Sequence, residues 1–234
     1  MAERQLIQDD EEQQYRALVE HTLRLAGDPH PLVDAIGVRV RAQADRYIVP
    51  TVPPVYDLPS LARFLDWYRE EVLVPIEAPA IIEAAEHLRK HEPRELIAQD
   101  RRLGEKAVLH PFAEASKAVG RSQLRRLLPM RDQKIIRQYW QAVEVGRAHG
   151  WHMIVFGLII GLFYIPYRQG LFAYARRTQF HFLQTAQDRL ALPPEAVQEL
   201  EQTVQEKTFR ALNELTGKGD LRVIRPHLSH RKRS

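Results

Sequence analysis

The sequence predicts an all-α fold, a single compact bundle of about nine or ten helices, from three observations. Strong helix formers (Ala, Leu, Glu, Gln and Arg) dominate its 234 residues. Alternating apolar and polar runs bounded by turn residues, the pattern of strands, are almost missing. Prolines and glycines interrupt the helical stretches at short intervals, which predicts short connections and helices packed into one body.

These interruptions place the elements in order along the chain. The clearest loop covers residues 48–59, which hold four prolines, and Asp57 or Ser60 is suited to cap the helix that follows. Pro75 and Pro79 predict a short break before the next helix. Residues 221–224 are the one candidate strand, and we interpret them as a loop. We expect helices over residues 5–26, 32–47, 61–74, 80–90, 93–103, 112–128, 132–148, 151–165, 167–190 and 195–215.

Residues 151–165, WHMIVFGLIIGLFYI, are nearly all apolar. A helix of this length spans about 22 Å, short of the roughly 30 Å of a bilayer's hydrocarbon core. We therefore interpret the segment as a fully buried helix of a soluble protein and predict no association with a membrane. Gly157 and Gly161 would let a neighbouring backbone approach it closely.

The charge is unevenly distributed. Lys and Arg total 34 and Asp and Glu total 30, which gives a net charge of +4. Residues 217–234 hold six basic residues and one acidic residue, so this segment contributes +5 and the first 216 residues sum to −1. We expect a near-neutral helical domain over residues 1–216 and a basic tail over residues 217–234 that orders against a partner.

Several kinds of chemistry find no support. The chain has no cysteine, which excludes disulfides, thiolate zinc sites and iron–sulfur clusters. The Walker, dinucleotide-binding, H-E-x-x-H and G-x-S-x-G motifs are missing. The polar N-terminal residues do not resemble a secretory signal. We therefore expect a cytoplasmic protein that is not an enzyme, with no catalytic residues and no cofactor.

His149 and His152 are spaced so that one helix face could carry both imidazoles. Two ligands do not complete a metal site, and Gly150 lies between them, so we expect His152 to cap or fill the core and assign no metal. A metal-dependent helical-bundle enzyme built on this pair is the alternative.

A basic stretch runs from Lys117 to Arg137, with seven positive residues and one acid. It indicates a solvated face paired with acids, a docking surface for an acidic protein, or a phosphate-binding surface. A helical nucleic-acid-binding module using the 117–137 face and the tail is therefore a further alternative.

Several blocks resemble the urease accessory protein family UreF, in the family's order. They are Leu23–Ala26 followed by Pro31, residues 61–80 with Glu77 and Pro79, Glu114-Ala115-Ser116 with Val119-Gly120-Arg121, and His152 with Val155-Phe156-Gly157 and Ile165-Pro166. Residues 32–42 and the prolines at 193 and 194 depart from the family pattern, so the chain resembles a divergent member.

The resemblance implies an all-α assembly factor without enzymatic activity or cofactor. Such proteins form homodimers, bind a UreD/UreH-type scaffold protein, recruit the GTPase UreG and support nickel delivery to apo-urease. The partner-binding residues that it suggests here are Ser116, Gly120 and Arg121, with Arg222 and Arg225 in the basic tail. It implies no nucleic acid and no membrane as partners.

Overall fold

The computed structural model describes residues 27–37, 52–129 and 134–217. Over these ranges it is helical, and the only pairing of extended backbone is an isolated bridge between Ile36 and Val55. The predicted all-α class is thus confirmed for the described residues. The count of nine or ten helices stays a prediction, because residues 1–26 and 38–51 lie outside these ranges.

A nearly continuous helical stretch forms the first half of the described fold. It comprises α2 (Leu58–Trp67), a wider π-helical segment η3 (Tyr68–Glu77) and α3 (Ala78–Arg89). Asp57 and Ser60 cap its start reciprocally, which confirms the expected cap. The break predicted at Pro75 and Pro79 is wrong. The π spacing bonds the N–H of Ala78 to the carbonyl of Leu73, and both prolines lie within the continuous helical stretch, Pro75 in η3 and Pro79 in α3.

The helix predicted over residues 32–47 is wrong at its start. Residues Pro31–Ala35 form a short 3₁₀ helix, η2, which ends at Ile36 in an extended conformation. The carbonyl of Ile36 accepts a hydrogen bond of 2.8 Å from Arg189, and Gly37 follows with a φ of +74°. These contacts hold the chain extended, and residues 38–47 lie outside the described ranges.

Later elements follow the prediction closely. They are α4 (Pro93–Leu103), η4 (Ala107–Phe112), α5 (Ala113–Leu127), α6 (Lys134–Glu144), α7 (His152–Leu162), α8 (Tyr167–Leu190) and α9 (Pro194–Gly217). α6 ends earlier than expected, because Gly146 turns the chain with a φ of +74° before the residues that lead into α7.

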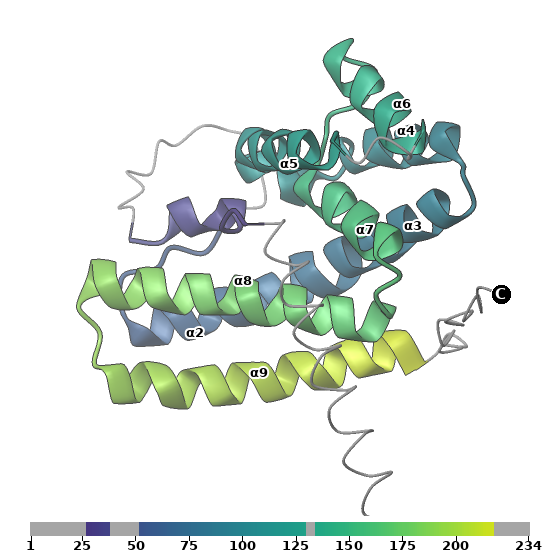
Figure 1. Cartoon of the computed structure of the whole chain (residues 1–234). Helices are drawn as coiled ribbons and strands as arrows, with labels where there is room; N and C mark the ends of the chain where they lie inside the picture. The colour runs from purple at the N-terminus through teal and green to yellow at the C-terminus, as the bar shows by residue number, and fades with distance from the viewer. Residues whose placement is uncertain (1–26, 38–51, 130–133, 218–234) are drawn as a thin grey trace, which may run out of the picture.

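α7 is the central helix, and all its residues from His152 to Gly161 are buried. It packs most extensively on α3 and then on α5 (Figure 1). A Cβ atom on Gly157 would lie 2.5 Å from the carbonyl oxygen of Ile81, so α3 contacts the bare backbone of α7. This confirms the buried helix and its close approach at Gly157. No helix in the described ranges combines the length and the hydropathy needed to cross a membrane.

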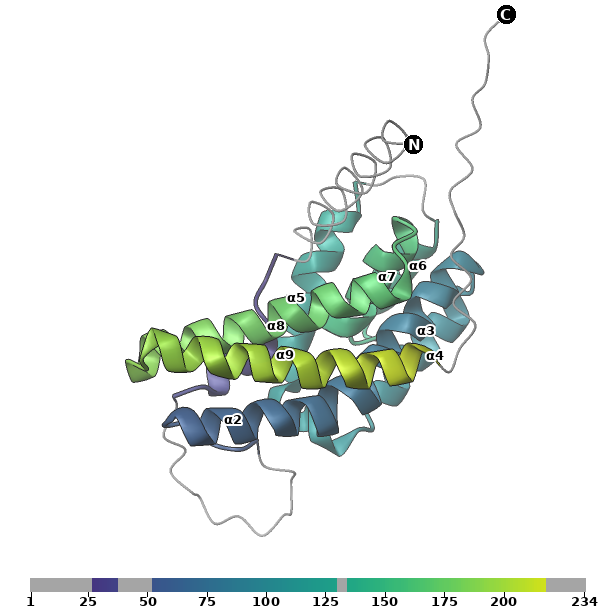
Figure 2. The same ribbon diagram turned by 90° about the horizontal axis from the view of Figure 1, so that it is seen from below.

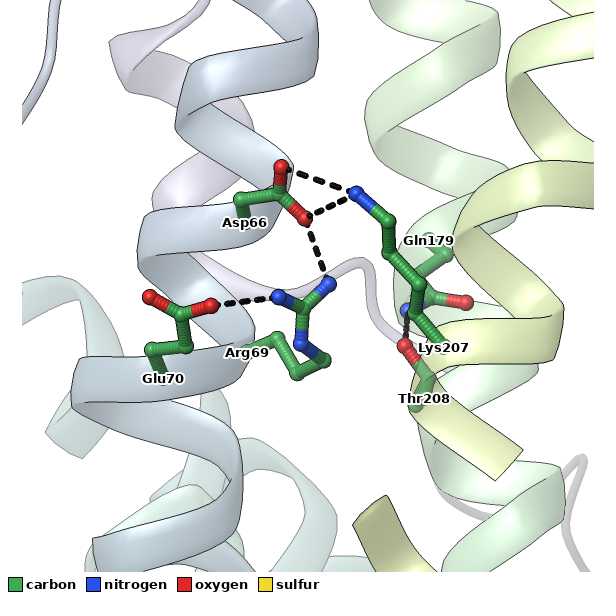
Figure 3. Close-up of polar contacts among 6 residues, drawn as sticks. All are labelled: Asp66, Arg69, Glu70, Gln179, Lys207 and Thr208. Carbon is green, nitrogen blue, oxygen red and sulfur yellow. Dashed lines mark hydrogen bonds and ion pairs between the residues drawn. The ribbon is translucent and has the colours of Figure 1, made fainter. Parts of the chain in front are cut away.

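α8 and α9 lie side by side on one face of the molecule, with α2 next to them (Figures 1 and 2). A buried hydrogen bond of 2.6 Å joins Gln179 on α8 to Thr208 on α9. Beside it, Lys207 on α9 contacts both carboxylate oxygens of Asp66 on α2 at 3.2 Å (Figure 3). The long C-terminal helix is therefore fixed to two other elements by polar contacts in addition to apolar packing.

Candidate functional site

Three buried side chains from distant parts of the sequence meet at the centre of the fold. His30 precedes η2, Glu77 ends η3 and His152 begins α7. One ligand atom from each of the three lies within 4.8 Å of the others. We refer to these three residues as the His–Glu–His cluster.

Glu77 is the acceptor at the centre of the cluster. Its Oε1 lies 2.8 Å from Nε2 of His30 and 3.4 Å from Nε2 of His152. Its Oε2 accepts a hydrogen bond of 2.6 Å from the hydroxyl of Tyr68. The backbone N–H of Leu32 donates to Nδ1 of His30 at 3.1 Å, so the ring proton of His30 is on Nε2 and is donated to Glu77.

His152 extends this network to two more helices. Its Nδ1 lies 2.6 Å from the hydroxyl of Ser116 on α5, and its Nε2 lies 2.7 Å from the hydroxyl of Tyr174 on α8. Every ring nitrogen of the two histidines thus has a polar neighbour, as buried polar atoms require. The expectation that His152 is a core residue is confirmed.

The electrostatics favour an ionised Glu77 and a neutral His152. Burial raises the pKa of Glu77, but its interaction with His30 and its hydrogen bonds to His152 and His30 outweigh burial and lower that pKa below its ordinary value. Burial lowers the pKa of His152, despite the opposing effect of Glu77. Burial and the charge of Glu77 raise the pKa of Tyr68 and of Tyr174. At neutral pH the cluster therefore holds an ionised Glu77 beside a neutral His152 and the neutral hydroxyls of Tyr68 and Tyr174.

A second buried carboxylate, Asp100 on α4, positions the start of α7. It accepts hydrogen bonds from the backbone N–H groups of His149, Gly150 (2.9 Å) and Trp151 (3.4 Å) and from the hydroxyl of Tyr139 (2.6 Å). The indole of Trp151 in turn donates to the carbonyl of Asp100 at 3.0 Å. These bonds fix the residues that lead into His152.

A cavity of about 30 Å³ lies beside the cluster. His30, His152 and Tyr174 form part of its wall, together with Asp28, Thr178 and His181. The volume is enough for a water molecule, and the wall supplies polar partners for one.

Two of the residues predicted to bind a partner are buried in the fold. Ser116 is buried on the cluster, and Gly120 is buried against the segment before α7. A Cβ atom on Gly120 would lie 2.0 Å from the carbonyl oxygen of Gly150. The surface that approaches these small residues is therefore the chain's own backbone, and a partner contact through them stays a prediction.

Arg121 is the predicted partner residue that the structure places at the surface. Its Nε donates to the carbonyl of His149 at 3.3 Å, which holds the side chain against the α7 entry. Arg222 and Arg225, like the whole tail from residue 218, lie outside the described residues, and so the boundary at 216/217 stays a prediction.

Arg121 belongs to a row of cations on the outer side of α5, with Lys117 one turn before it and Arg125 one turn after it. Lys117 lies 3.0 Å from Glu114 and 5.3 Å from the ring centre of Trp151. The guanidinium of Arg125 lies 5.6 Å from the ring centre of Trp140 on α6. We call Lys117, Arg121 and Arg125 the α5 basic row; of the rest of the stretch, Arg131 lies outside the described residues.

His149 and His152 do not form the pair considered from their spacing. The ring of His149 lies near Gly104 and Trp151, whereas His152 turns inward to the cluster. Sequence reasoning missed His30 and Glu77 as partners of His152. Glu77 lies near Pro79 in a block that resembles the UreF family. Nothing in the local sequence around His30 indicates that His30 is a site residue.

A sequence model of the UreF family matches residues 55–202 of the chain. The matched range includes Glu77, Ser116, His152 and Tyr174, and His30 precedes it. No curated protein and no solved structure gives a significant match.

Proposed function

Because the chain belongs to the UreF family, we propose that it is a urease accessory protein that acts as an assembly factor and not as an enzyme. In this role it binds a UreD/UreH-type scaffold protein and the GTPase UreG, and the assembly supports nickel insertion into apo-urease. A cytoplasmic homodimer is the form that we propose for it.

The observation that carries this proposal is the extent of the family match. It begins at Val55, three residues before α2, and continues into α9, so it covers most of the described helices. The sequence blocks that resemble the family are not confined to one place in the fold. Glu77, Ser116 and His152, which stand in three of these blocks, lie on different elements and meet in one hydrogen-bonded network.

The α5 basic row supports docking on a protein. Lys117 and Arg125 each lie over an aromatic ring, and Arg121 is held by a backbone carbonyl. Side chains that are already ordered lose less conformational entropy when a partner binds. A short row of three ordered cations fits an acidic patch on a scaffold or GTPase.

Co-expression tests the proposal directly. We would express the chain with a UreD/UreH-type protein, a UreG-type GTPase and apo-urease, isolate the complex, and measure urease activation with nickel and GTP. Co-purification and activation that depends on the chain are expected. If the complete set of partners neither co-purifies with the chain nor needs it for urease activation, the proposal is wrong.

Charge reversal locates the contact. Arg121→Glu should weaken co-purification at least tenfold, while Arg94→Glu, at another exposed arginine on α4, should leave it unchanged. Deletion of residues 218–234 should leave the helical domain folded and weaken the complex. If all three variants form the complex as well as the wild-type chain does, both the α5 basic row and the tail are excluded as docking surfaces.

The nucleic-acid alternative predicts a different result when the same variants are tested for DNA binding and urease activation. Binding to duplex DNA should then fall steeply between low and physiological salt, because phosphate contacts release counterions. Arg121→Glu would reduce that binding while urease activation stayed intact.

A further inference from the structure

The His–Glu–His cluster offers the donor atoms of a transition-metal site. Two imidazole nitrogens and a carboxylate oxygen suit borderline divalent ions such as Zn²⁺, Co²⁺ and Ni²⁺. We propose that this cluster binds one divalent transition-metal ion through Nε2 of His30, Oε1 of Glu77 and Nε2 of His152. The inference concerns the chain alone and does not depend on the proposed function.

The distances between the donor atoms are close to those of a metal site. With metal–ligand bonds of about 2.1 Å, tetrahedral geometry separates neighbouring donors by about 3.4 Å. Nε2 of His152 already lies 3.4 Å from Oε1 of Glu77. Nε2 of His30 lies 2.8 Å from the same oxygen, so this contact has to open by about half an ångström for an ion to enter.

Burial strengthens the case. The side chains of His30 and Glu77 are 1% and 0% exposed, and that of His152 is 4% exposed. A carboxylate in such surroundings interacts strongly with a cation, because little water screens its charge. A divalent ion bound here would offset the negative charge of Glu77 and leave a net charge of +1 on the site.

Neighbouring groups hold two of the three ligands in orientation. The hydroxyl of Tyr68 occupies Oε2 of Glu77 and leaves Oε1 directed at the two imidazoles. Ser116 contacts Nδ1 of His152, so Nε2 is the nitrogen that faces Glu77. Nε2 also lies 2.7 Å from the hydroxyl of Tyr174, which has to turn away from this nitrogen when the ion binds. Outer contacts of this kind fix the tautomer and the ring orientation of metal-binding histidines.

The adjoining cavity gives room for a further ligand. Its wall includes His30 and His152, and its volume of about 30 Å³ can hold a water molecule as a fourth ligand. The hydroxyl of Tyr174, 2.7 Å from Nε2 of His152, is the nearest protein oxygen that this water would contact.

Metal binding has a consequence at His30. Its Nε2 proton must move to Nδ1 so that Nε2 can bind the ion, and Nδ1 then no longer accepts from the N–H of Leu32. That hydrogen bond caps η2. Occupation of the site would therefore loosen the start of η2.

The experiment uses the purified, untagged full-length chain with Co²⁺ as the probe. We expect one ion per chain by equilibrium dialysis and visible absorption bands of four-coordinate Co²⁺. X-ray absorption of the wild-type complex should show scattering from two imidazoles. This last measurement needs no variant and so avoids any loss of folding. Failure to bind one ion per chain, or a bound ion without imidazole scattering, would overturn the proposal.

Variants assign the site. His152→Ala and Glu77→Gln should each weaken Co²⁺ binding at least tenfold. His87→Ala is the matched control, because His87 also contacts two carboxylates, Glu83 and Glu92, but through different nitrogens and near the surface. The double variant His227→Ala, His230→Ala tests the tail. Binding that survives both cluster substitutions, or that is lost with the tail histidines, would contradict the assignment.

Discussion

Ser116 on α5 and His152 at the start of α7 lie 36 positions apart and share a hydrogen bond of 2.6 Å. Each stands in a separate sequence block that resembles the UreF family, and the bond joins the two blocks inside the fold. Two sequence blocks that suggest a docking surface thus contact each other inside the fold, and the side chain of Arg121 stays exposed.

The contact between α5 and the entry to α7 depends on Gly120. Gly120→Ala should lower the free energy of unfolding by about 1–3 kcal/mol, because the new methyl group meets the backbone at Gly150 and His152 and no flexible side chain can move aside. Urea unfolding followed by circular dichroism measures it. Alanine otherwise stabilises a helix interior relative to glycine by about 1 kcal/mol.

Gly217→Ala at the end of α9 is the control, since nothing lies within 4 Å of the added Cβ atom. Its unfolding free energy should change by no more than about 0.5 kcal/mol. Equal effects at the two positions would contradict the tight approach at Gly120.

Asp100 holds the residues before α7 through backbone N–H groups. Asp100→Asn should destabilise the chain by about 2–3 kcal/mol, because an amide NH₂ group would face donors in place of an acceptor oxygen. The midpoint of urea unfolding reports the change. Asp188→Asn on the exposed side of α8 should shift that midpoint only slightly, and a similar shift for both variants would show that Asp100 does not fix the α7 entry.

The polar contacts between α9 and its neighbours should differ in strength (Figure 3). Thr208→Val removes the acceptor for the buried amide of Gln179 and should cost about 1–3 kcal/mol. Lys207→Ala breaks an ion pair with Asp66 whose side chains are 47% and 36% exposed, and should cost about 0.2–1 kcal/mol.

Thermal unfolding of the two variants, measured in low and high salt, distinguishes these contributions. Only the Lys207→Ala effect should shrink in high salt, because salt screens the exposed pair. A larger loss for Lys207→Ala than for Thr208→Val would contradict this ranking.

The cap at the start of α2 makes stability depend on pH. Hydrogen bonds from the side chain and backbone of Ser60 lower the pKa of Asp57 below its ordinary value of 3.8. A carboxyl whose pKa is lower in the folded state stabilises it above the unfolded pKa, and this contribution disappears as pH falls through the folded pKa. The wild type should therefore lose its greater folding stability relative to Asp57→Asn below about pH 4.

Urea unfolding of both proteins between about pH 3 and pH 7 tests this sign. The difference in unfolding free energy between the wild type and Asp57→Asn should be constant in the upper half of this pH range and become smaller in the lower part. A difference that grows as pH falls would mean that the pKa of Asp57 is raised on folding.

Local sequence accounted for many helix positions. α8 coincides with its predicted range, and the apolar run at 151–165 is the buried α7, because a segment apolar on all sides has to be enclosed. Local patterns failed where contacts with distant residues determine the backbone conformation. Ile36 is held extended by Arg189, and the prolines at 75 and 79 are accommodated by π spacing that no propensity scale indicates.

For the candidate site, too, some features follow from the sequence and others only from the tertiary structure. Sequence alone determined the all-α class, the buried helix, the concentration of positive charge in the tail and on residues 117–137, and the family resemblance, since composition, periodicity and motif order belong to the chain itself. Only the tertiary structure decided that His152 is paired with His30 and Glu77 and not with His149, and that Ser116 and Gly120 face inward. The physical reason is that burial and hydrogen-bond partners depend on which helices meet, and a contact between residues 30, 77 and 152 leaves no periodic trace in the sequence.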